Sequence, residues 1–120
     1  MTVPFVRADA GGREIVNVVA SSGASHTVDL ADGNVHDVTL DANCTLTFAG
    51  TVADRACSFV LLLRQDATGS HTVTWPGEVV WSDGTAPTLS DAADAIDIVT
   101  FFTVDNGTTW FGFVSGQAMA

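Results

Sequence analysis

The fold is decided by two stretches, DATGSHTVTWPGEVVWSDGTAPTL (residues 66–89) and DIVTFFTVDNGTTWFGFV (residues 97–114). Val73 and Trp75 alternate with threonines, which is the two-residue period of a strand with one buried face. Pro76-Gly77 ends that strand, because proline lacks the backbone N–H that a central ladder needs. Asp105-Asn106-Gly107 is the strongest hairpin signal in the chain. The two stretches therefore predict short β-strands that are separated by tight turns.

The remainder of the chain repeats this pattern of apolar and β-branched runs between turn residues. The alternation in Cys44–Phe48 places its cysteine, leucine and phenylalanine inward and its threonines outward. The unbroken apolar run within Cys57–Gln65 predicts a central strand that is covered on both faces. Gly112 predicts a bulge or a close approach by another backbone. Further strands are expected at residues 15–20, 27–30, 38–40, 72–75, 79–81, 96–104 and 108–114.

These elements predict a single all-β domain, an antiparallel β-sandwich of jelly-roll type. No internal repeat of 20–50 residues is evident in the sequence. The expected sandwich occupies residues 15–116. Residues 1–14 are interrupted by proline and glycine and are expected to form either a frayed terminus or an extended arm that lies on a neighbouring subunit. Residues 117–120 form a tail of mostly small residues.

Composition limits the kinds of partner. The 120-residue chain contains no lysine and four arginines, and its formal charge is -10. Such a surface repels phosphate backbones and anionic lipids, so we expect neither nucleic-acid nor membrane partners. The sequence contains no transmembrane run, and its N-terminus lacks the features of a signal peptide, which predicts synthesis in the host cytoplasm.

No arrangement of residues in the sequence predicts catalysis, a metal or another cofactor. There is no phosphate-binding loop, dinucleotide fingerprint or nucleophile elbow, so we expect no catalytic residues and no enzyme activity. His26, His36 and His71 lack metal-ligand spacing and are interpreted as structural or exposed. The carboxylates of Asp29, Asp32 and Asp37 crowd one turn and could hold Ca²⁺, but they do not match an EF-hand, which favours a solvated acidic loop.

One group of residues could contact sugars. Trp75, Trp81 and Trp110 could form a stacking surface, and Glu78 lies between the first two in the sequence. Core packing is favoured as their main role, because Trp75 is in phase with Val73 and Trp81 with Val79.

The two cysteines allow a geometric prediction. If Cys44–Phe48 and Cys57–Leu63 form a hairpin, Cys44 lies opposite Cys57, at a distance close to disulfide geometry. Folding in a reducing cytoplasm favours free thiols, so we expect two buried, reduced cysteines.

Several motifs together resemble a known family. They are residues 64–69, 72–76, Trp81, 84–89, 97–98 and 107–113. The combination is similar to a β-rich domain of tailed-bacteriophage virion proteins, found in tail-fibre and minor tail proteins and as short stand-alone products. The resemblance covers roughly residues 28–116. It implies structural or adhesive work without enzymatic activity, usually as a trimer.

The leading functional prediction is a capsid decoration (cement) protein that coats or stabilises the head. The alternative is a tail or tail-fibre module that binds a host-surface glycan through Trp75, Glu78 and Trp81. A small hydrolase is a distant third. In each virion role the location is the capsid surface or the tail.

The expected partners are further copies of the chain, as a homotrimer, and the major capsid protein or another virion protein. Phe111 and Phe113 share one face of the last strand, and a single sandwich interior leaves that face in need of cover. In the N-terminal arm, which holds two of the four arginines, contacts with a neighbour are expected from Phe5, Val6, Arg7 and Arg13.

Overall fold

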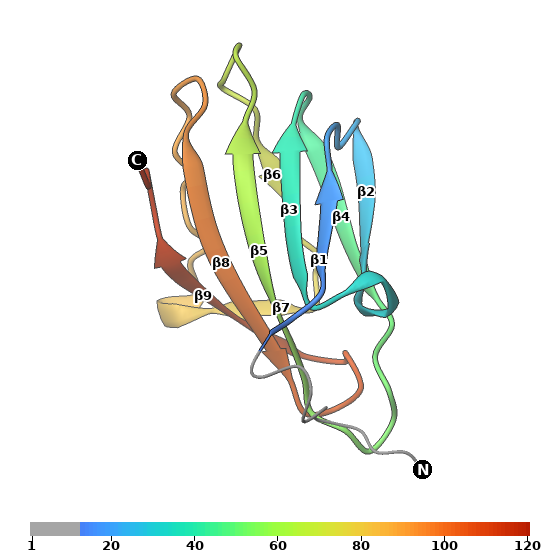
Figure 1. Cartoon of the computed structure of the whole chain (residues 1–120). Coiled ribbons are helices and arrows are strands. Elements are labelled where there is room, and N and C mark those ends of the chain that lie inside the picture. Colours follow the sequence, from blue (N-terminus) through green and yellow to red (C-terminus); the bar gives the residue numbers. More distant parts are fainter. Residues whose placement is uncertain (1–12) are drawn as a thin grey trace.

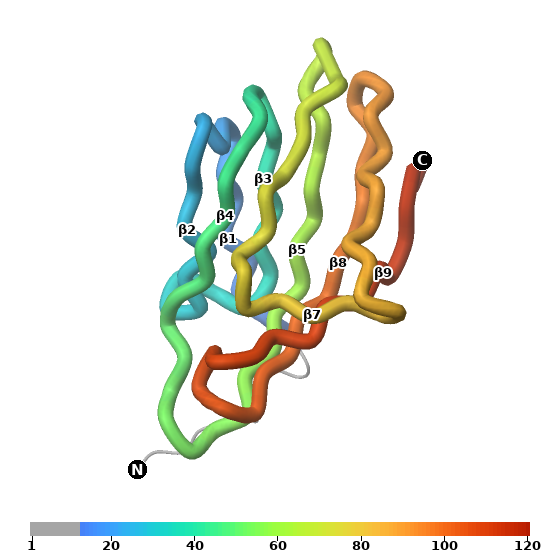
Figure 2. The backbone as a smooth tube through the Cα atoms, turned by 180° about the vertical axis from the view of Figure 1, so that it is seen from behind, coloured from blue at the N-terminus to red at the C-terminus, as the bar shows by residue number. Residues whose placement is uncertain are grey.

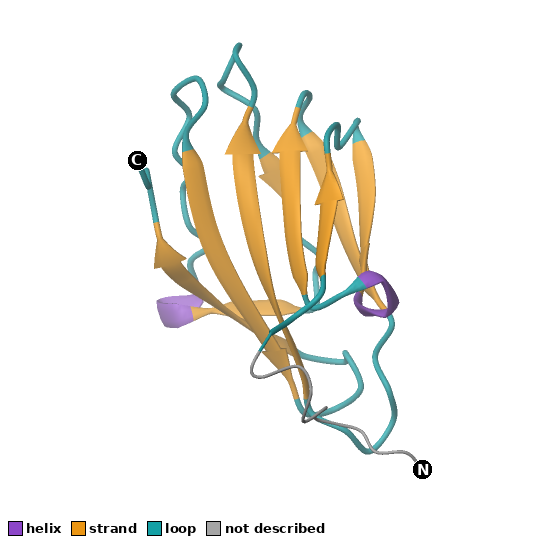
Figure 3. Ribbon diagram, viewed as in Figure 1, coloured by secondary structure: helices purple, strands orange, loops and turns teal. Residues whose placement is uncertain are grey.

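The computed structural model describes residues 13–120, which form two facing β-sheets and two short 3₁₀ turns (Figure 3). The strands are β1 (Val16–Val19), β2 (Ser25–Asp29), β3 (Val35–Leu40), β4 (Cys44–Ala49), β5 (Cys57–Gln65), β6 (Val73–Thr74), β7 (Val79–Trp81), β8 (Ile96–Thr103) and β9 (Trp110–Gly116). The 3₁₀ turns are η2 (Leu30–Asp32) and η3 (Ser82–Gly84). The prediction of an all-β domain is confirmed.

The chain spirals between the two sheets. The six-stranded sheet has the order β1-β3-β5-β8-β9-β7, and the three-stranded sheet has the order β2-β4-β6. Strands therefore alternate between the sheets from β1 to β7, and up to β6 the strands two apart in the sequence lie side by side (Figures 1 and 2). β7 pairs instead with β9. Each excursion through one sheet serves as the crossover that parallel strands in the other sheet require.

The predicted antiparallel sandwich of jelly-roll type is wrong for most of the strand pairs in the two sheets. Five of the seven described strand pairs are parallel, and only β5–β8 and β8–β9 are antiparallel. The turns after β1, β3 and β5 carry the chain to the opposite sheet instead of folding it back as a hairpin. Val16 pairs with Val35 and Val35 with Val60, so successive turns of the spiral contain different numbers of residues. The sequence therefore shows no repeat of fixed length.

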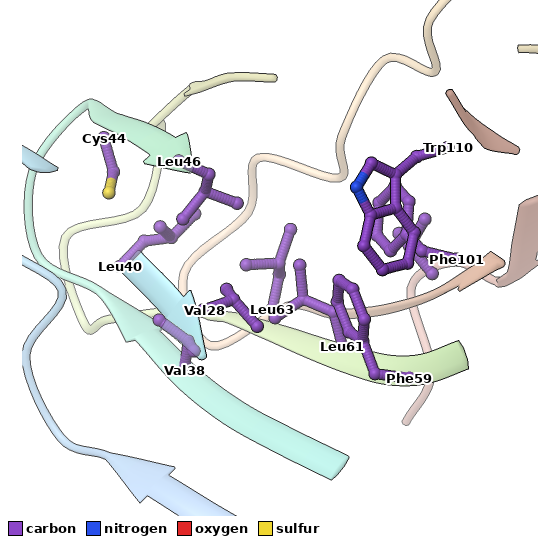
Figure 4. Packing of buried hydrophobic residues seen from close by; sticks show 11 residues of the cluster. Val28, Val38, Leu40, Cys44, Leu46, Phe59, Leu61, Leu63, Phe101 and Trp110 are labelled. Carbon is purple, nitrogen blue, oxygen red and sulfur yellow. The ribbon is translucent and has the colours of Figure 1, made fainter. Parts of the chain in front are cut away.

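The core lies between the sheets and is built by alternation. In β5 the side chains of Phe59, Leu61 and Leu63 are buried, and their neighbours along the strand are less so. Figure 4 shows these residues packed with apolar side chains from the facing strands. At one end, the rings of Phe48 and Trp110 pack edge to face at 5.4 Å and join the aromatic part of this core.

The central position of β5 is confirmed, because β3 and β8 flank it. Its predicted coverage on both faces is wrong. Val60 and Leu62 point away from the core and remain half-buried on an uncovered face. A strand with only one covered face can therefore still have an unbroken apolar sequence.

The Asp105-Asn106-Gly107 turn joins the antiparallel strands β8 and β9, which confirms the predicted hairpin. Asn106 and Gly107 both have positive φ, as the residue types suggest. The close approach predicted at Gly112 also occurs, but the neighbour is the Trp81 ring and not another backbone. The β-bulge between β8 and β9 lies at Ile98/Val99.

The C-terminal residues fold back onto the domain. Asp97 is buried, and its carboxylate accepts hydrogen bonds from the backbone N–H of Ser90 at 2.7 Å and of Ala118 at 2.9 Å. The Gln117 side chain donates to the Thr88 carbonyl at 2.7 Å. One buried carboxylate thus connects the start of β8 to the loop before it and to the chain end.

The predicted Cys44–Cys57 hairpin is wrong. Cys44 lies in the three-stranded sheet and pairs with Val73, while Cys57 lies in the six-stranded sheet and pairs with Thr103. Both thiols are free; Cys44 is buried, but Cys57 is only half-buried. The prediction of two buried cysteines therefore holds for Cys44 alone.

Candidate functional site

A groove lies at the point where strand pairing in the three-stranded sheet stops. The pairing of β6 with β4 stops at Thr45 and Thr74, after which the chain turns away through Pro76. The edge of β4 beyond Thr45 is left beside a hollow of about 340 Å³. Its lining comprises Thr45, Leu46, Thr47, Phe48, Thr51, Trp75, Pro76, Gly77, Glu78, Asn106, Gly107 and Trp110.

The first wall of the groove is a fixed turn. The N–H of Val79 donates to the carbonyl of Pro76 at 3.1 Å, which closes a tight turn. The N–H of Trp110 donates to the Glu78 carbonyl at 3.0 Å and attaches this turn to β9. These bonds project the Glu78 side chain outward, where it is exposed. Among the described residues the Glu78 carboxylate has no hydrogen-bond partner, so it is available to a ligand.

The opposite wall is the Asn106-Gly107 turn. Asp105 accepts hydrogen bonds from the Thr103 hydroxyl at 2.9 Å and from the Thr109 N–H at 2.8 Å, and the Thr103 oxygen accepts from the Gly107 N–H at 3.0 Å. The backbone bond to Thr109 is the largest cause that holds the pKa of Asp105 below its usual range. Thr51 donates to the Asn106 carbonyl at 3.3 Å and closes the end of the groove.

The groove combines aromatic surface with polar groups. Trp75 is half-buried, and Thr45 and Thr47 present hydroxyls from the outer face of β4. The indole N–H of Trp110 has no acceptor within the described part of the chain, although its ring is almost fully buried. Such a site suits a ligand with an apolar face and several hydroxyls, because the threonines can donate or accept hydrogen bonds while Glu78 only accepts.

A second hollow of about 320 Å³ lies on the other side of Trp75, between β6 and the segment before β8. Ser70, Pro87, Leu89 and Asp91 are among its lining residues. Trp75 lines both hollows, so it stands between two places where a ligand can bind.

The structure separates the three residues expected to contact a glycan. Trp75 and Glu78 line the groove, as that expectation required, but Trp81 is not among the lining residues. Its ring packs against Trp75 at 5.1 Å and covers Gly112. The preference for core packing is confirmed for both tryptophans, since both contact the hydrophobic core. The sequence offered no signal for Thr51 or Asn106 as lining residues, because both reach the groove from distant turns.

The residues expected to contact other subunits lie elsewhere. Phe111 and Phe113 are exposed on the outer face of β9, away from the core. Arg13 is exposed just before β1. Phe5, Val6 and Arg7 lie outside the described residues, and the prediction for them stays a prediction.

The carboxylates considered for Ca²⁺ do not converge. Asp37 lies on the outer face of β3 and forms an ion pair with Arg64, whereas Asp29 accepts from the Ala31 N–H at the start of η2. No group of three or more metal-ligating side chains occurs in residues 13–120.

Other acidic side chains and histidines form hydrogen bonds that hold loops in place. Asp66 accepts from the backbone N–H groups of Gly69 and Thr68 and from His71, and these bonds, the one from Gly69 foremost, hold the pKa of its carboxyl below the usual range. His36 is fully buried and contacts the Gly33 carbonyl through Nε2 at 2.9 Å. The structural interpretation of His36 and His71 fits these contacts.

The comparisons with known proteins give one finding. Searches of curated proteins and of solved structures returned no significant match. A family model matches residues 19–110, which is more than half of the chain. No helix within the described residues has the length and apolar character needed to cross a membrane.

The family match confirms the resemblance to phage virion proteins and supports a structural role in the virion. It favours the tail-fibre alternative over capsid decoration, which was the leading prediction. The chain belongs to the family described as "putative phage tail fibre C-terminal domain".

Proposed function

We propose that this domain is a tail-fibre module that binds a host-surface glycan in the groove beside Trp75. The observation that carries the proposal is the composition of that groove. An indole wall, an unpaired carboxylate and several hydroxyls surround a hollow held open by hydrogen-bonded turns. A sugar ring has an apolar face that can pack on an indole and hydroxyls that need such partners.

The charge of the chain points to a neutral glycan. The formal charge is -10, and Glu78 adds a negative charge at the groove itself. Anionic sugars would be repelled, most strongly at low ionic strength. A neutral saccharide avoids this repulsion and can donate hydroxyl hydrogen bonds to Glu78.

Binding without cleavage fits the same residues. Glycoside hydrolysis by the usual route uses two carboxyl groups on either side of the scissile bond. Glu78 is the sole carboxylate among the residues that line the groove. An adhesive role therefore fits this groove better than a hydrolytic one.

Titration calorimetry with neutral oligosaccharides prepared from host surface polysaccharide tests the proposal. Trp75→Ala and Glu78→Gln should each weaken binding about tenfold, the equivalent of about 1.4 kcal/mol. The matched controls are Trp81→Ala, in the same aromatic cluster, and Asp83→Asn, in another exposed turn. Heat denaturation establishes that each variant is folded at the assay temperature. Equal losses for Trp75→Ala and Trp81→Ala, or no wild-type binding to any neutral glycan, would contradict the proposal.

The location on the particle is tested separately. Gold-labelled antibody against the protein, imaged on intact particles, should decorate the tail. Label confined to the head would restore capsid decoration as the better interpretation.

A further inference from the structure

The edge of β4 that borders the groove directs backbone groups into it. In a parallel sheet, the N–H and C=O of one residue point to the same side of the strand, and the next residue points to the other side. The Thr45 N–H donates to the Ala24 carbonyl before β2 at 3.0 Å, whereas the Cys44 N–H donates to the Thr72 carbonyl before β6 at 2.9 Å. Even-numbered residues of β4 therefore point their backbone groups toward β6, and odd-numbered residues point theirs toward β2.

Phe48 has no strand beside it on the β6 side. The pairing of β4 with β6 ends at Thr45 and Thr74, and Figure 2 shows the chain after β6 turning away from β4 toward β7. Within residues 13–120, neither the N–H nor the C=O of Phe48 therefore has a hydrogen-bond partner. Phe48 is half-buried and lines the groove. Backbone groups in such a setting are nearly always paired, so a ligand in the groove would find a donor and an acceptor here.

The other walls of the groove supply groups of both kinds as well. The exposed Glu78 carboxylate is an acceptor on the turn that follows Pro76. The Trp110 indole N–H is a donor beside the opposite turn, since a Cβ atom added to Gly107 would lie 3.4 Å from Trp110 Nε1. A ligand that fills the groove thus meets a donor and an acceptor on the β4 edge, and one of each on the facing residues.

We infer that the glycan bound in this groove carries an acetamido group, and that the backbone of Phe48 binds this group. The inference rests on the proposed function and names the class of sugar. A trans secondary amide has its N–H and its C=O on opposite edges, so it needs partners on two sides. If its carbonyl accepts from the Phe48 N–H, its own N–H is directed away from β4, where Glu78 is the acceptor. In the reverse orientation it donates to the Phe48 carbonyl and accepts from Trp110.

The remaining features of an acetamido sugar also suit the groove. Its methyl group is apolar and can pack on the half-buried Trp75 ring. The acetamido group carries no charge, so it avoids the repulsion that an anionic sugar would meet from a chain of formal charge -10.

A peptide added as a further strand fits this edge less well. β4 ends at Ala49, so the free groups on its β6 side are those of Phe48 and the carbonyl of Leu46. The bond from Thr51 to the Asn106 carbonyl closes the groove just beyond. Strand addition depends on a longer row of main-chain bonds, whereas one amide group needs a single free residue.

Nuclear magnetic resonance of the ¹⁵N-labelled full chain tests the inference. The ligands are the methyl glycosides of N-acetylglucosamine, N-acetylgalactosamine and N-acetylmannosamine, each compared with its parent hexose. In at least one pair the acetamido sugar should bind about tenfold tighter or more, because the hexose lacks the amide bonds and the methyl contact. The Phe48 amide proton should shift on binding. The Thr47 amide is the internal control, since its N–H points toward β2 and should respond little.

Equal affinities within all three pairs would overturn the inference, as would an acetamido sugar that binds without moving the Phe48 amide. A neutral acetylated tetrapeptide amide is titrated in parallel, and its binding more tightly than every acetamido sugar would overturn the inference in favour of strand addition. Binding of neutral host oligosaccharides but of no acetamido sugar would overturn the inference and leave the proposed function standing. Failure of every neutral saccharide to bind would refute the proposed function, and this inference with it.

Discussion

Gly112→Ala is the sharpest test of how the aromatic cluster is packed. A Cβ atom at this position would lie 2.6 Å from Cζ3, 2.8 Å from Cε3 and 2.9 Å from Cη2 of Trp81. Ordinary contact begins near 3.4 Å, so the Trp81 ring must move by most of an ångström. That ring is confined by Trp75 at 5.1 Å and by Phe101 at 5.7 Å, which makes the movement costly.

The expected loss follows from two opposing effects. Overpacking costs about 1–3 kcal/mol. Alanine regains about 0.5–1 kcal/mol, because glycine loses more backbone entropy in a strand. The free energy of unfolding should therefore fall by about 1–2 kcal/mol, and Tm by roughly 3–6 °C for each kcal/mol in a domain of this size.

Urea denaturation followed by circular dichroism measures this change, and a double-mutant cycle identifies its cause. Trp81→Leu removes the six-membered ring that faces Gly112, so Gly112→Ala should cost little in that background. Gly77→Ala is the control, because a Cβ atom there meets nothing within 4 Å. The reasoning is refuted if Gly112→Ala is as stable as Gly77→Ala, or if its cost is the same with and without the Trp81 ring.

Three further outcomes are expected. Burial lowers the pKa of His26 below its value in the unfolded chain, so the unfolded state binds the proton first and stability should fall as pH drops below about 6.5; a pH series of urea melts in which His26→Gln keeps the wild-type slope would contradict this. Asp97→Asn should lower the free energy of unfolding by about 1.5–3 kcal/mol, because a neutral amide replaces a buried carboxylate that accepts two backbone N–H groups; exposed Asp83→Asn should be near neutral in the same urea melts. Ellman's reagent should modify half-buried Cys57 before Cys44, where burial raises the thiol pKa; equal rates in the native protein would count against the described burial.

Local patterns in the sequence predicted the strands well. The alternation in Cys44–Phe48 identified both the strand and its inward face, which the structure confirms for Cys44 and Leu46. The Asp105-Asn106-Gly107 turn identified the β8–β9 hairpin. These successes share a cause: alternation and turn conformation depend on residues close together in the chain.

The pairing of strands was decided by the tertiary structure alone. A turn such as Asp41-Ala42-Asn43 has the same composition whether it folds a strand back beside its neighbour or carries it to the opposite sheet. In this protein the turn carries the chain to the opposite sheet, so β3 pairs with β5, and Cys44 is separated from Cys57. Parallel order depends on which apolar faces meet across the core, and that choice involves residues far apart in sequence.

The residues of the candidate site also divide into those that the sequence identified and those that only the tertiary structure brings to the groove. The sequence singled out Trp75 and Glu78, because an aromatic side chain and a carboxylate lie near each other in one turn. Thr51 and Asn106 join them only after the chain has spiralled, since the loop after β4 and the β8–β9 turn come together at the end of the groove. The sequence by itself determined the strands, the turns and the unusual acidity, which are properties of neighbouring residues and of composition. The parallel coils, the open groove and the uncovered outer face of β5 were decided by tertiary structure, because each depends on which distant segments pack together and which are left uncovered.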